Sequence, residues 1–181
     1  MLKCAKIVIV LFYLGCSDEH NNKCLGIDSV DISRNIWIDS TCETDVLMAS
    51  VDAADLLNDF GKKYVCSDLI NIVGLIDVIN HDSWMTKINV PVITCHYDEI
   101  YVPELIHGYA TNFSIDLYLW LINRYGYKYF RRLILHEMMH FIGVWDHAES
   151  IDSVMNPDLK TTDCKFTDED VDLFCKYFDC I

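Results

Sequence analysis

The chain is poor in proline, in basic residues and in long apolar runs. Three prolines among 181 residues provide no Pro-rich linker, and the length is that of one domain. Only 14 Lys and Arg residues stand against 28 Asp and Glu residues, so the formal net charge is −14. Because binding to nucleic acid requires clustered Lys and Arg, this balance argues against a nucleic-acid partner. Hydrophobic residues nevertheless make up 52% of the chain, which indicates a folded core rather than disorder.

An apolar run near the N-terminus is too short to cross a bilayer. It covers residues 7–15 and follows two lysines, whereas a membrane-spanning helix needs about 20 residues. This pattern is typical of a secretory signal peptide. The run ends in Tyr13-Leu14-Gly15-Cys16, which resembles the lipobox of bacterial lipoproteins and so implies a lipid anchor at Cys16. A buried N-terminal strand is the alternative interpretation.

The composition turns polar directly after this run. We expect a signal peptide over residues 1–16, a polar tether over 17–34 and one folded domain over 35–181. The mature protein would then be extracytoplasmic, either anchored to a membrane or secreted.

Nine cysteines are consistent with that location. Cys4 and Cys16 lie in the targeting segment, and the other seven are many for a reduced cytosolic protein. Because seven is odd, at least one of them either stays a thiol or pairs elsewhere. No CxxC pair occurs, so a structural zinc site made of four cysteines is not expected.

Hydrophobic periodicity predicts a long helix between a short strand and a sheet. Residues 36–39 alternate like a strand, and Ser40 and Glu43 have the spacing of a capping box. Apolar residues then recur at helical spacing, and Gly61 is expected to end the helix. Short runs rich in Ile, Val and Tyr between 64 and 123 predict about four strands.

Two further helices are predicted in the second half of the chain. One covers residues 127–142. The other follows Thr167 and extends to about Tyr177, because three acidic residues at 168–170 suit the positive end of a helix.

The helix at 127–142 carries the residues with chemical potential. His136 and His140 are four residues apart, about 40° around a helix axis, so both imidazoles can reach one cation. Neutral imidazole is a good zinc ligand, and a catalytic zinc takes three protein ligands and one open position. Glu137 would point beside the metal, where it can take a proton from metal-bound water as general base. We therefore predict one catalytic Zn²⁺.

The residues after this helix offer the third ligand. Gly143 follows His140 by three residues and permits the left-handed turn that ends a helix. Asp146 and His147 follow at once, so that turn can carry a ligand back toward the metal.

This pattern resembles that of the metzincin superfamily of zinc endopeptidases, which is H-E-x-x-H-x-x-G-x-x-H or -D followed by a Met-turn. Residues 153–157, Ser-Val-Met-Asn-Pro, look like the Met-turn, closest to its matrixin form. The resemblance implies His136 and His140 as metal ligands and Glu137 as the general base. It also implies that Met155 lies beneath the metal.

The resemblance leaves two candidates for the third ligand. In matrixins it is a His three residues after the glycine, and that position is Asp146, as in the Gly-x-x-Asp-His run of snapalysins. Counting back from Met155 with the matrixin spacing reaches His147 instead. We favour Asp146, because the turn after the helix fixes geometry more tightly than a loop does. His147 is the alternative.

The resemblance also implies how the cleft is built. The strand that contains residues 118–120 would lie along the cleft and pair with an extended substrate. Residues 157–159 would form the outer wall of the pocket beside the scissile bond.

A second metal site is not predicted. His81, Asp82, His96 and His107 only loosely resemble the structural zinc site of some matrixins, and their spacing is that of ordinary histidines. No calcium loop of the EF-hand type is present, so a structural Ca²⁺ has no support either.

The expected fold is an α+β, metzincin-like zinc-peptidase domain. It would combine a mixed twisted sheet, a long N-terminal helix, an active-site helix, a Met-turn and a C-terminal helix. The expected function is the hydrolysis of peptide bonds in extracellular proteins or peptides by a monomeric enzyme. The alternatives are a non-catalytic zinc-binding surface protein derived from a peptidase, which would have no use for Glu137, and a helical core segment without a metal.

Overall fold

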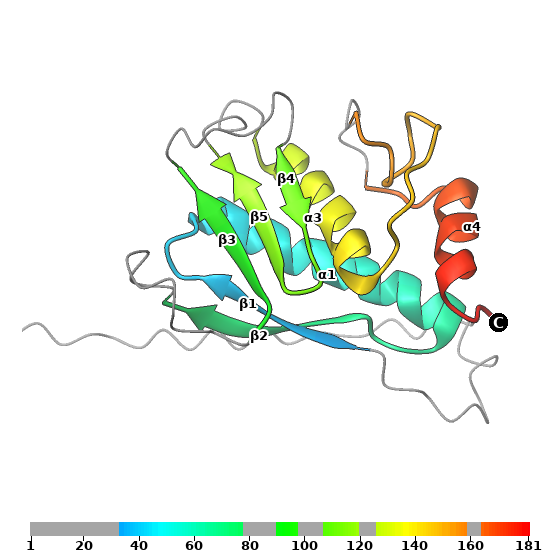
Figure 1. Cartoon of the computed structure of the whole chain (residues 1–181), viewed down its shortest axis with the longest axis horizontal. Coiled ribbons are helices and arrows are strands. Elements are labelled where there is room, and N and C mark those ends of the chain that lie inside the picture. Colours follow the sequence, from blue (N-terminus) through cyan, green and yellow to red (C-terminus); the bar gives the residue numbers. More distant parts are fainter. Residues whose placement is uncertain (1–32, 78–89, 98–106, 120–125, 159–163) are drawn as a thin grey trace, which may run out of the picture.

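The structure is a computed structural model that describes residues 33–77, 90–97, 107–119, 126–158 and 164–181. Within these ranges the chain forms a five-stranded mixed sheet and three helices, which confirms the α+β class (Figure 1). The predicted signal peptide, the lipid anchor at Cys16 and nearly all of the tether lie outside the described residues.

The sheet has the strand order β2-β1-β3-β5-β4. The first four strands in this order run parallel, and the last is antiparallel to its neighbour β5. Four of the five strands fall between residues 64 and 123, as predicted. Their bounds are Arg34–Asp39 for β1, Ile70–Ile76 for β2, Val92–His96 for β3, Gly108–Ala110 for β4 and Ser114–Tyr118 for β5.

Side chains alternate between the two faces of the sheet. Ile93, Ile115 and Leu117 are fully buried on the face that the helices cover (Figure 1). Polar side chains of β3 and β5, such as Thr94 and Asp116, point to the other face. Each fully buried Leu or Ile contributes about 1.5–3 kcal/mol to the stability of the fold.

Two helices cross the covered face and pack on each other. They are α1 (Thr44–Val65) and α3 (Tyr127–Ile142), and α3 has the bounds predicted from the sequence. Both helices carry buried apolar side chains at helical spacing. Helix α3 contacts both α1 and the edge strand β4. This position holds the candidate ligand helix rigidly under one edge of the sheet.

The predicted ends of the first helix are wrong. The predicted capping box of Ser40 and Glu43 does not form: the helix begins at Thr44, its N-cap residue is Glu43, and no side chain caps it. The hydroxyl of Ser40 donates a hydrogen bond to Asp77 instead. Gly61 does not end the helix but lies inside it. A Cβ there would lie 2.5 Å from Cγ of Leu69, so glycine is required by close packing rather than by a turn. The left-handed residue that ends the helix is Cys66, with φ of 55°.

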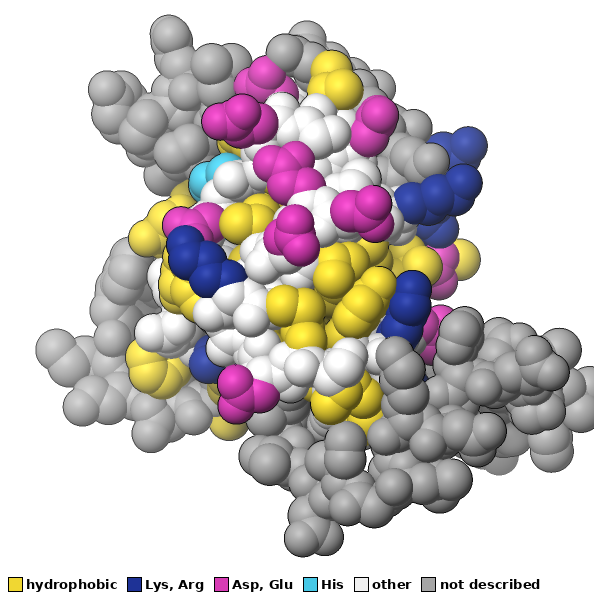
Figure 2. Space-filling model, turned by 90° about the vertical axis from the view of Figure 1, so that its right-hand side faces the viewer, with side chains coloured by type: hydrophobic (Ala, Val, Ile, Leu, Met, Phe, Trp, Pro, Cys, Tyr) yellow, Lys and Arg dark blue, Asp and Glu magenta, His cyan; other side chains and the backbone are white. Residues whose placement is uncertain are grey.

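The C-terminal helix is confirmed as α4 (Asp168–Tyr177). Thr167 is its N-cap and forms a capping box with Asp170. On the face of the molecule shown in Figure 2, acidic side chains are grouped and basic ones are scattered, as the net charge leads one to expect.

Two disulfides join described residues. Cys42–Cys95 ties the segment before α1 to β3, and Cys175–Cys180 closes the end of α4. They indicate an oxidising compartment outside the cytoplasm. Cys164 is in neither disulfide, and its buried Sγ accepts a hydrogen bond from Nε of Arg131. In the described part of the chain, no helix is long and apolar enough to span a bilayer.

Candidate metal centre

Helix α3 brings its two candidate histidines onto one face. His136, Glu137 and His140 are 4%, 5% and 8% exposed, so all three ionisable side chains are enclosed. The helix ends at Gly143, which has a φ of 118°, and the next amide, that of Val144, donates to the carbonyl of Met139. This left-handed turn directs the following residues back along the helix.

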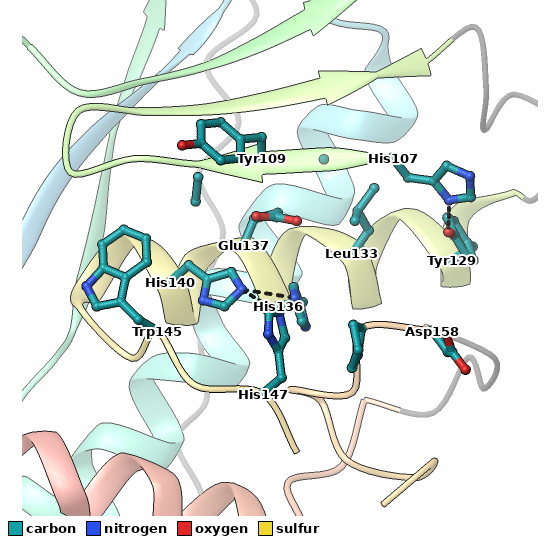
Figure 3. A pocket seen from close by; sticks show the side chains of 13 residues that line it. His107, Tyr109, Tyr129, Leu133, His136, Glu137, His140, Trp145, His147 and Asp158 are labelled. Carbon is teal, nitrogen blue, oxygen red and sulfur yellow. Dashed lines mark hydrogen bonds between the residues drawn. The ribbon is translucent and has the colours of Figure 1, made fainter. Parts of the chain in front are cut away.

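The returning loop adds a third imidazole. Nε2 of His140 lies 3.1 Å from Nε2 of His136 and 3.2 Å from Nε2 of His147. Figure 3 shows the three rings converging on one point below β4. These three residues form a group that could hold a metal ion.

Asp146, the favoured third ligand, points elsewhere. Its carboxylate accepts hydrogen bonds from Nζ of Lys176 at 2.5 Å and from the hydroxyl of Tyr177 at 2.7 Å, both in α4. The preference for Asp146 is therefore corrected in favour of the alternative, His147. The physical reason is that adjacent residues in an extended loop point in opposite directions, and α4 supplies partners for the carboxylate.

The hydrogen bonds of the Nδ1 atoms determine which ring nitrogen of His136 and of His140 carries the proton. Nδ1 of His136 lies 2.8 Å from the carbonyl oxygen of Val154, and Nδ1 of His140 lies 2.7 Å from that of Val144. A carbonyl only accepts, so each Nδ1 carries the proton and each Nε2 presents a lone pair to the centre. Converging lone pairs repel one another unless a cation lies between them.

The spacing of the nitrogens fits a metal of the first transition series. Tetrahedral ligands about 2.0–2.1 Å from zinc lie about 3.3 Å apart, close to the separations of the two Nε2 pairs. A donated Nδ1–H is also the usual arrangement around a metal-bound histidine, because it fixes the tautomer and the ring orientation. The donor set therefore fits a resident divalent metal.

Loss of solvation favours the neutral form of the three imidazoles, although His147 is exposed and only the two helix histidines are buried. It lowers the pKa of His136 to about 3, aided by the neighbouring His140, and it lowers the pKa of both His140 and His147. Neutral imidazole is the form that binds metals, since protonation removes the lone pair. These rings are ready to bind a metal at neutral pH.

Glu137 lies beside the cluster, between α3 and β4 (Figure 3). Burial raises the pKa of its carboxyl to about 8. A divalent cation at the three nitrogens would lower this pKa, because a nearby positive charge favours the ionised form. A loaded centre would thus hold a carboxylate next to the open position of the metal.

The segment predicted to be a Met-turn lies directly behind the cluster. Met155 is fully buried, and its carbonyl accepts from the amide of Ala148, the residue after His147. Its neighbour Val154 holds the ring of His136, as described above. The segment therefore positions both His136 on the helix and the loop that carries His147.

A buried carboxylate anchors this segment to α4. Asp170 is fully buried and accepts from the hydroxyl of Ser153 at 2.5 Å and from the amides of Val154 and Met155 at 3.1 and 3.0 Å. It also accepts from the amide and the hydroxyl of Thr167. In the sequence this residue is visible only as part of a helix start, because a long-range contact leaves no local pattern.

The cluster opens into a cleft of about 450 Å³. The edge strand β4 forms its upper wall (Figure 3), and Pro157 and Asp158 also line it, whereas residue 159 of the predicted outer wall lies outside the described residues. Tyr109 and Trp145 are 56% and 45% exposed at this cleft. Neither aromatic residue was identified from the sequence, although Trp145 lies within the ligand segment.

The strand assigned to the cleft wall is corrected. Residues 118–120 were expected to lie along the cleft, but β5 is an inner strand paired on both sides, by β3 and β4. Leu119 is fully buried, and Trp120 lies outside the described residues. The short strand β4 precedes β5 in the chain, is antiparallel to it across the turn at residues 111–113, and forms the edge of the described sheet.

The other two described histidines, His96 and His107, have ordinary partners. Nε2 of His96 lies 2.9 Å from the carboxylate of Asp116, and Nδ1 of His107 contacts the hydroxyl of Tyr129. His81 and Asp82 lie outside the described residues. Among the described residues, only His136, His140 and His147 form a group with metal-binding geometry.

Comparisons of the chain with protein-family models, with curated proteins and with solved structures find no match. The resemblance to metzincins therefore rests on residues 136–157 alone.

Proposed function

We propose that this protein is a zinc-dependent endopeptidase that hydrolyses peptide bonds of extracellular proteins. The observation that carries the proposal is the convergence of three Nε2 atoms next to a buried carboxylate in an open cleft. The short segment that resembles metzincins supports the same reaction.

The donor set favours zinc over other metals. Three imidazoles leave one position open for water or substrate in tetrahedral coordination, as in catalytic zinc sites. Oxygen-seeking cations such as Ca²⁺ and Mg²⁺ prefer carboxylates and carbonyls, and the cluster offers neither at its centre. When bound, zinc would polarise the scissile carbonyl and lower the pKa of its bound water to about 7.

Glu137 is the residue proposed to move the proton. It adjoins His136 in the helix, so its carboxylate lies beside the cluster rather than within it. Ionised Glu137 takes a proton from the attacking water and then delivers it to the amine of the leaving peptide. A cation at the three nitrogens would lower the pKa of this buried carboxyl below its metal-free value, which makes the ionised form available to take the proton.

The cleft wall suits an extended peptide. Of the described strands, only β5 pairs with β4, so the opposite edge of β4 lies at the cleft. An extended substrate can add to such an edge through main-chain hydrogen bonds, which read no particular sequence. The exposed rings of Tyr109 and Trp145 would contact its side chains. This mode of binding is expected of an endopeptidase.

The surroundings of the site agree with an extracellular substrate. The two disulfides belong in an oxidising compartment. We propose a monomeric enzyme that is either secreted or held at a membrane through Cys16, in line with the sequence of its first sixteen residues.

Replacing Glu137 tests the proposal. Glu137→Ala should retain about one zinc per chain, because the three nitrogens remain, but kcat on a casein-type substrate should fall by about 10²–10⁴-fold. Glu149→Ala is the matched control, since this exposed glutamate lies in the following loop. Zinc content would be measured by elemental analysis and kcat by peptide release.

Two results would overturn the proposal. Full activity in Glu137→Ala would exclude this residue as the base. A purified wild-type protein that holds zinc but cleaves no protein or peptide substrate would favour the non-catalytic zinc-binding alternative.

A further inference from the structure

The edge strand passes unusually close to Glu137 at Gly108. A Cβ atom on Gly108 would lie 3.0 Å from Oε1 and 3.1 Å from Cγ of Glu137, and 3.2 Å from Cδ1 of Leu133. These distances are shorter than ordinary van der Waals contacts, so a side chain at this position needs the neighbours to move. The glycine therefore leaves the space that the glutamate occupies.

Neither side of this contact is free to withdraw. Gly108 pairs with Leu117 of β5, and Ala110 at the other end of the strand pairs with Ile115. The carbonyl of His107, just before the strand, accepts from the amide of Tyr118 at 3.0 Å. The height of β4 above the helix is thus set by the sheet.

The helix below is held equally firmly. Leu133, Ile134 and Met138 are fully buried around Glu137 in α3, so the backbone that carries the carboxylate cannot sink into the core without displacing them. The carboxylate itself would have to swing aside. It would then leave the place beside the three imidazoles that Figure 3 shows.

Backbone conformation gives no other reason for glycine here. The φ angle of Gly108 is not positive, so alanine can adopt its backbone conformation. In a strand with room for a methyl group, replacing Gly by Ala stabilises the fold by about 0.4–1 kcal/mol, because the unfolded chain loses conformational freedom. A loss of stability in Gly108→Ala, in place of the usual gain, would therefore indicate the close contact with Glu137.

We propose that Gly108 is a positioning residue, whose missing side chain lets β4 close over Glu137 and fixes the carboxylate at the height of the metal centre. The inference rests on the proposed function, because it is Glu137 as general base that needs this position. A misplacement of about 1 Å can lower a reaction rate by about 10²-fold.

The steric part of the proposal is tested by stability alone, on metal-free protein. Gly108→Ala should lower Tm by a few degrees, opposite to the usual effect of this replacement. In the Glu137→Ala background most of that loss should disappear, because the added methyl then meets only Leu133. Ala110→Gly, on the same face of β4, is the control and should change Tm equally in both backgrounds.

The catalytic part is tested by kinetics and zinc affinity. Gly108→Ala should lower kcat by about 10- to 100-fold, while KM and the zinc affinity measured by chelator competition stay within about twofold of wild type, since neither β4 pairing nor the imidazoles are touched.

The contrary outcomes are distinct for the two proposals. A higher Tm in Gly108→Ala, an equal loss of Tm in both backgrounds, or unchanged kcat would overturn the role of Gly108. A parallel loss of zinc would overturn it too, because the site as a whole would then have changed. The proposed function would still stand in all these cases, provided that Glu137→Ala alone abolishes cleavage.

Discussion

His96 on β3 and the three histidines below β4 all lie next to other polar groups, but of these two described regions only the second has the geometry of a metal centre. On the face of the sheet opposite the helices, His96 shares the carboxylate of Asp116 with the hydroxyls of Thr94 and Ser114. Behind β4, by contrast, three imidazoles point their Nε2 atoms at one another, and no acid lies among them.

The difference lies in where the second ring nitrogen is bound. In the centre behind β4, backbone carbonyls hold Nδ1 of His136 and His140, so the lone pairs are left to converge. His96 instead directs a ring nitrogen at a carboxylate, which already satisfies it. A group of histidines therefore indicates a metal only when the protein supplies acceptors for the outer nitrogens and none for the inner ones.

The largest expected effect comes from removing one histidine from each region. Loss of a residue that hydrogen-bonds a metal ligand typically lowers metal affinity by about 10- to 100-fold. His147→Ala should lower zinc affinity further than this, because it removes a proposed ligand itself. His96→Ala should leave zinc affinity unchanged. Chelator competition would measure both, and equal losses would erase the distinction between the two regions.

The same measurement separates the two residues proposed as third ligand. Asp146→Ala should keep the wild-type zinc affinity, because it breaks only an exposed ion pair with Lys176 and a hydrogen bond with Tyr177. A large loss of zinc in Asp146→Ala, with none in His147→Ala, would restore the preference that the sequence alone suggested.

A smaller effect is expected from the carboxylates that organise each region. Asp170→Asn should lower zinc affinity by about 10- to 100-fold, since Asp170 anchors the segment that holds the ring of His136. It should also lower the free energy of unfolding by about 2–4 kcal/mol, because hydrogen bonds to a buried charge are lost. Asp116→Asn should reduce stability without changing zinc affinity.

Asp172→Asn is the matched control for α4, as this aspartate is exposed on the same helix. It should alter neither quantity. If Asp170→Asn lowered only stability, the Met-turn segment would not position the ligands.

The smallest effects are opposite pH dependences of stability in metal-free protein. Burial raises the pKa of Glu137 from 4.5 to about 8, so between these values the folded state binds more protons and stability falls as pH rises. Glu137→Gln should therefore gain stability over wild type as pH goes from 5 to 8.

Asp116 should behave in the other direction. Burial alone would raise its pKa, but hydrogen bonds from His96, Thr94 and Ser114 outweigh burial and lower the pKa below 3.8. Its contribution is present above pH 3.8 and is lost as pH falls through the folded-state pKa. Asp116→Asn should thus cost stability at neutral pH and progressively less in acid. Tm measured across pH 3 to 8 for both variants checks the two signs.

Local sequence patterns predicted what short-range physics determines. Helix α3, the C-terminal helix α4 and the turn at Gly143 follow from periodicity, acidic residues in a first turn and a glycine at a helix end. The start and end of α1 were misassigned, because Ser40 and Gly61 have long-range partners, Asp77 and Leu69, that outweigh their local preferences.

The choice between Asp146 and His147 as third ligand also depended on a long-range contact. Counting from Gly143 favoured Asp146, whereas the spacing to Met155 favoured His147. The second count was the better guide, because the amide of Ala148 pairs with the carbonyl of Met155 and fixes the loop between them. The edge position of β4, the anchor at Asp170 and the close approach at Gly108 depend on tertiary contacts, for which the sequence has no periodic signal.

Anomalous diffraction at the zinc absorption edge, from crystals of the protein purified without chelator, tests the central claim most directly. We expect one strong peak about 2.0–2.1 Å from Nε2 of His136, His140 and His147, with Glu137 beside its open position. A peak that includes the carboxylate of Asp146 in place of His147, or no peak behind β4 at all, would contradict it.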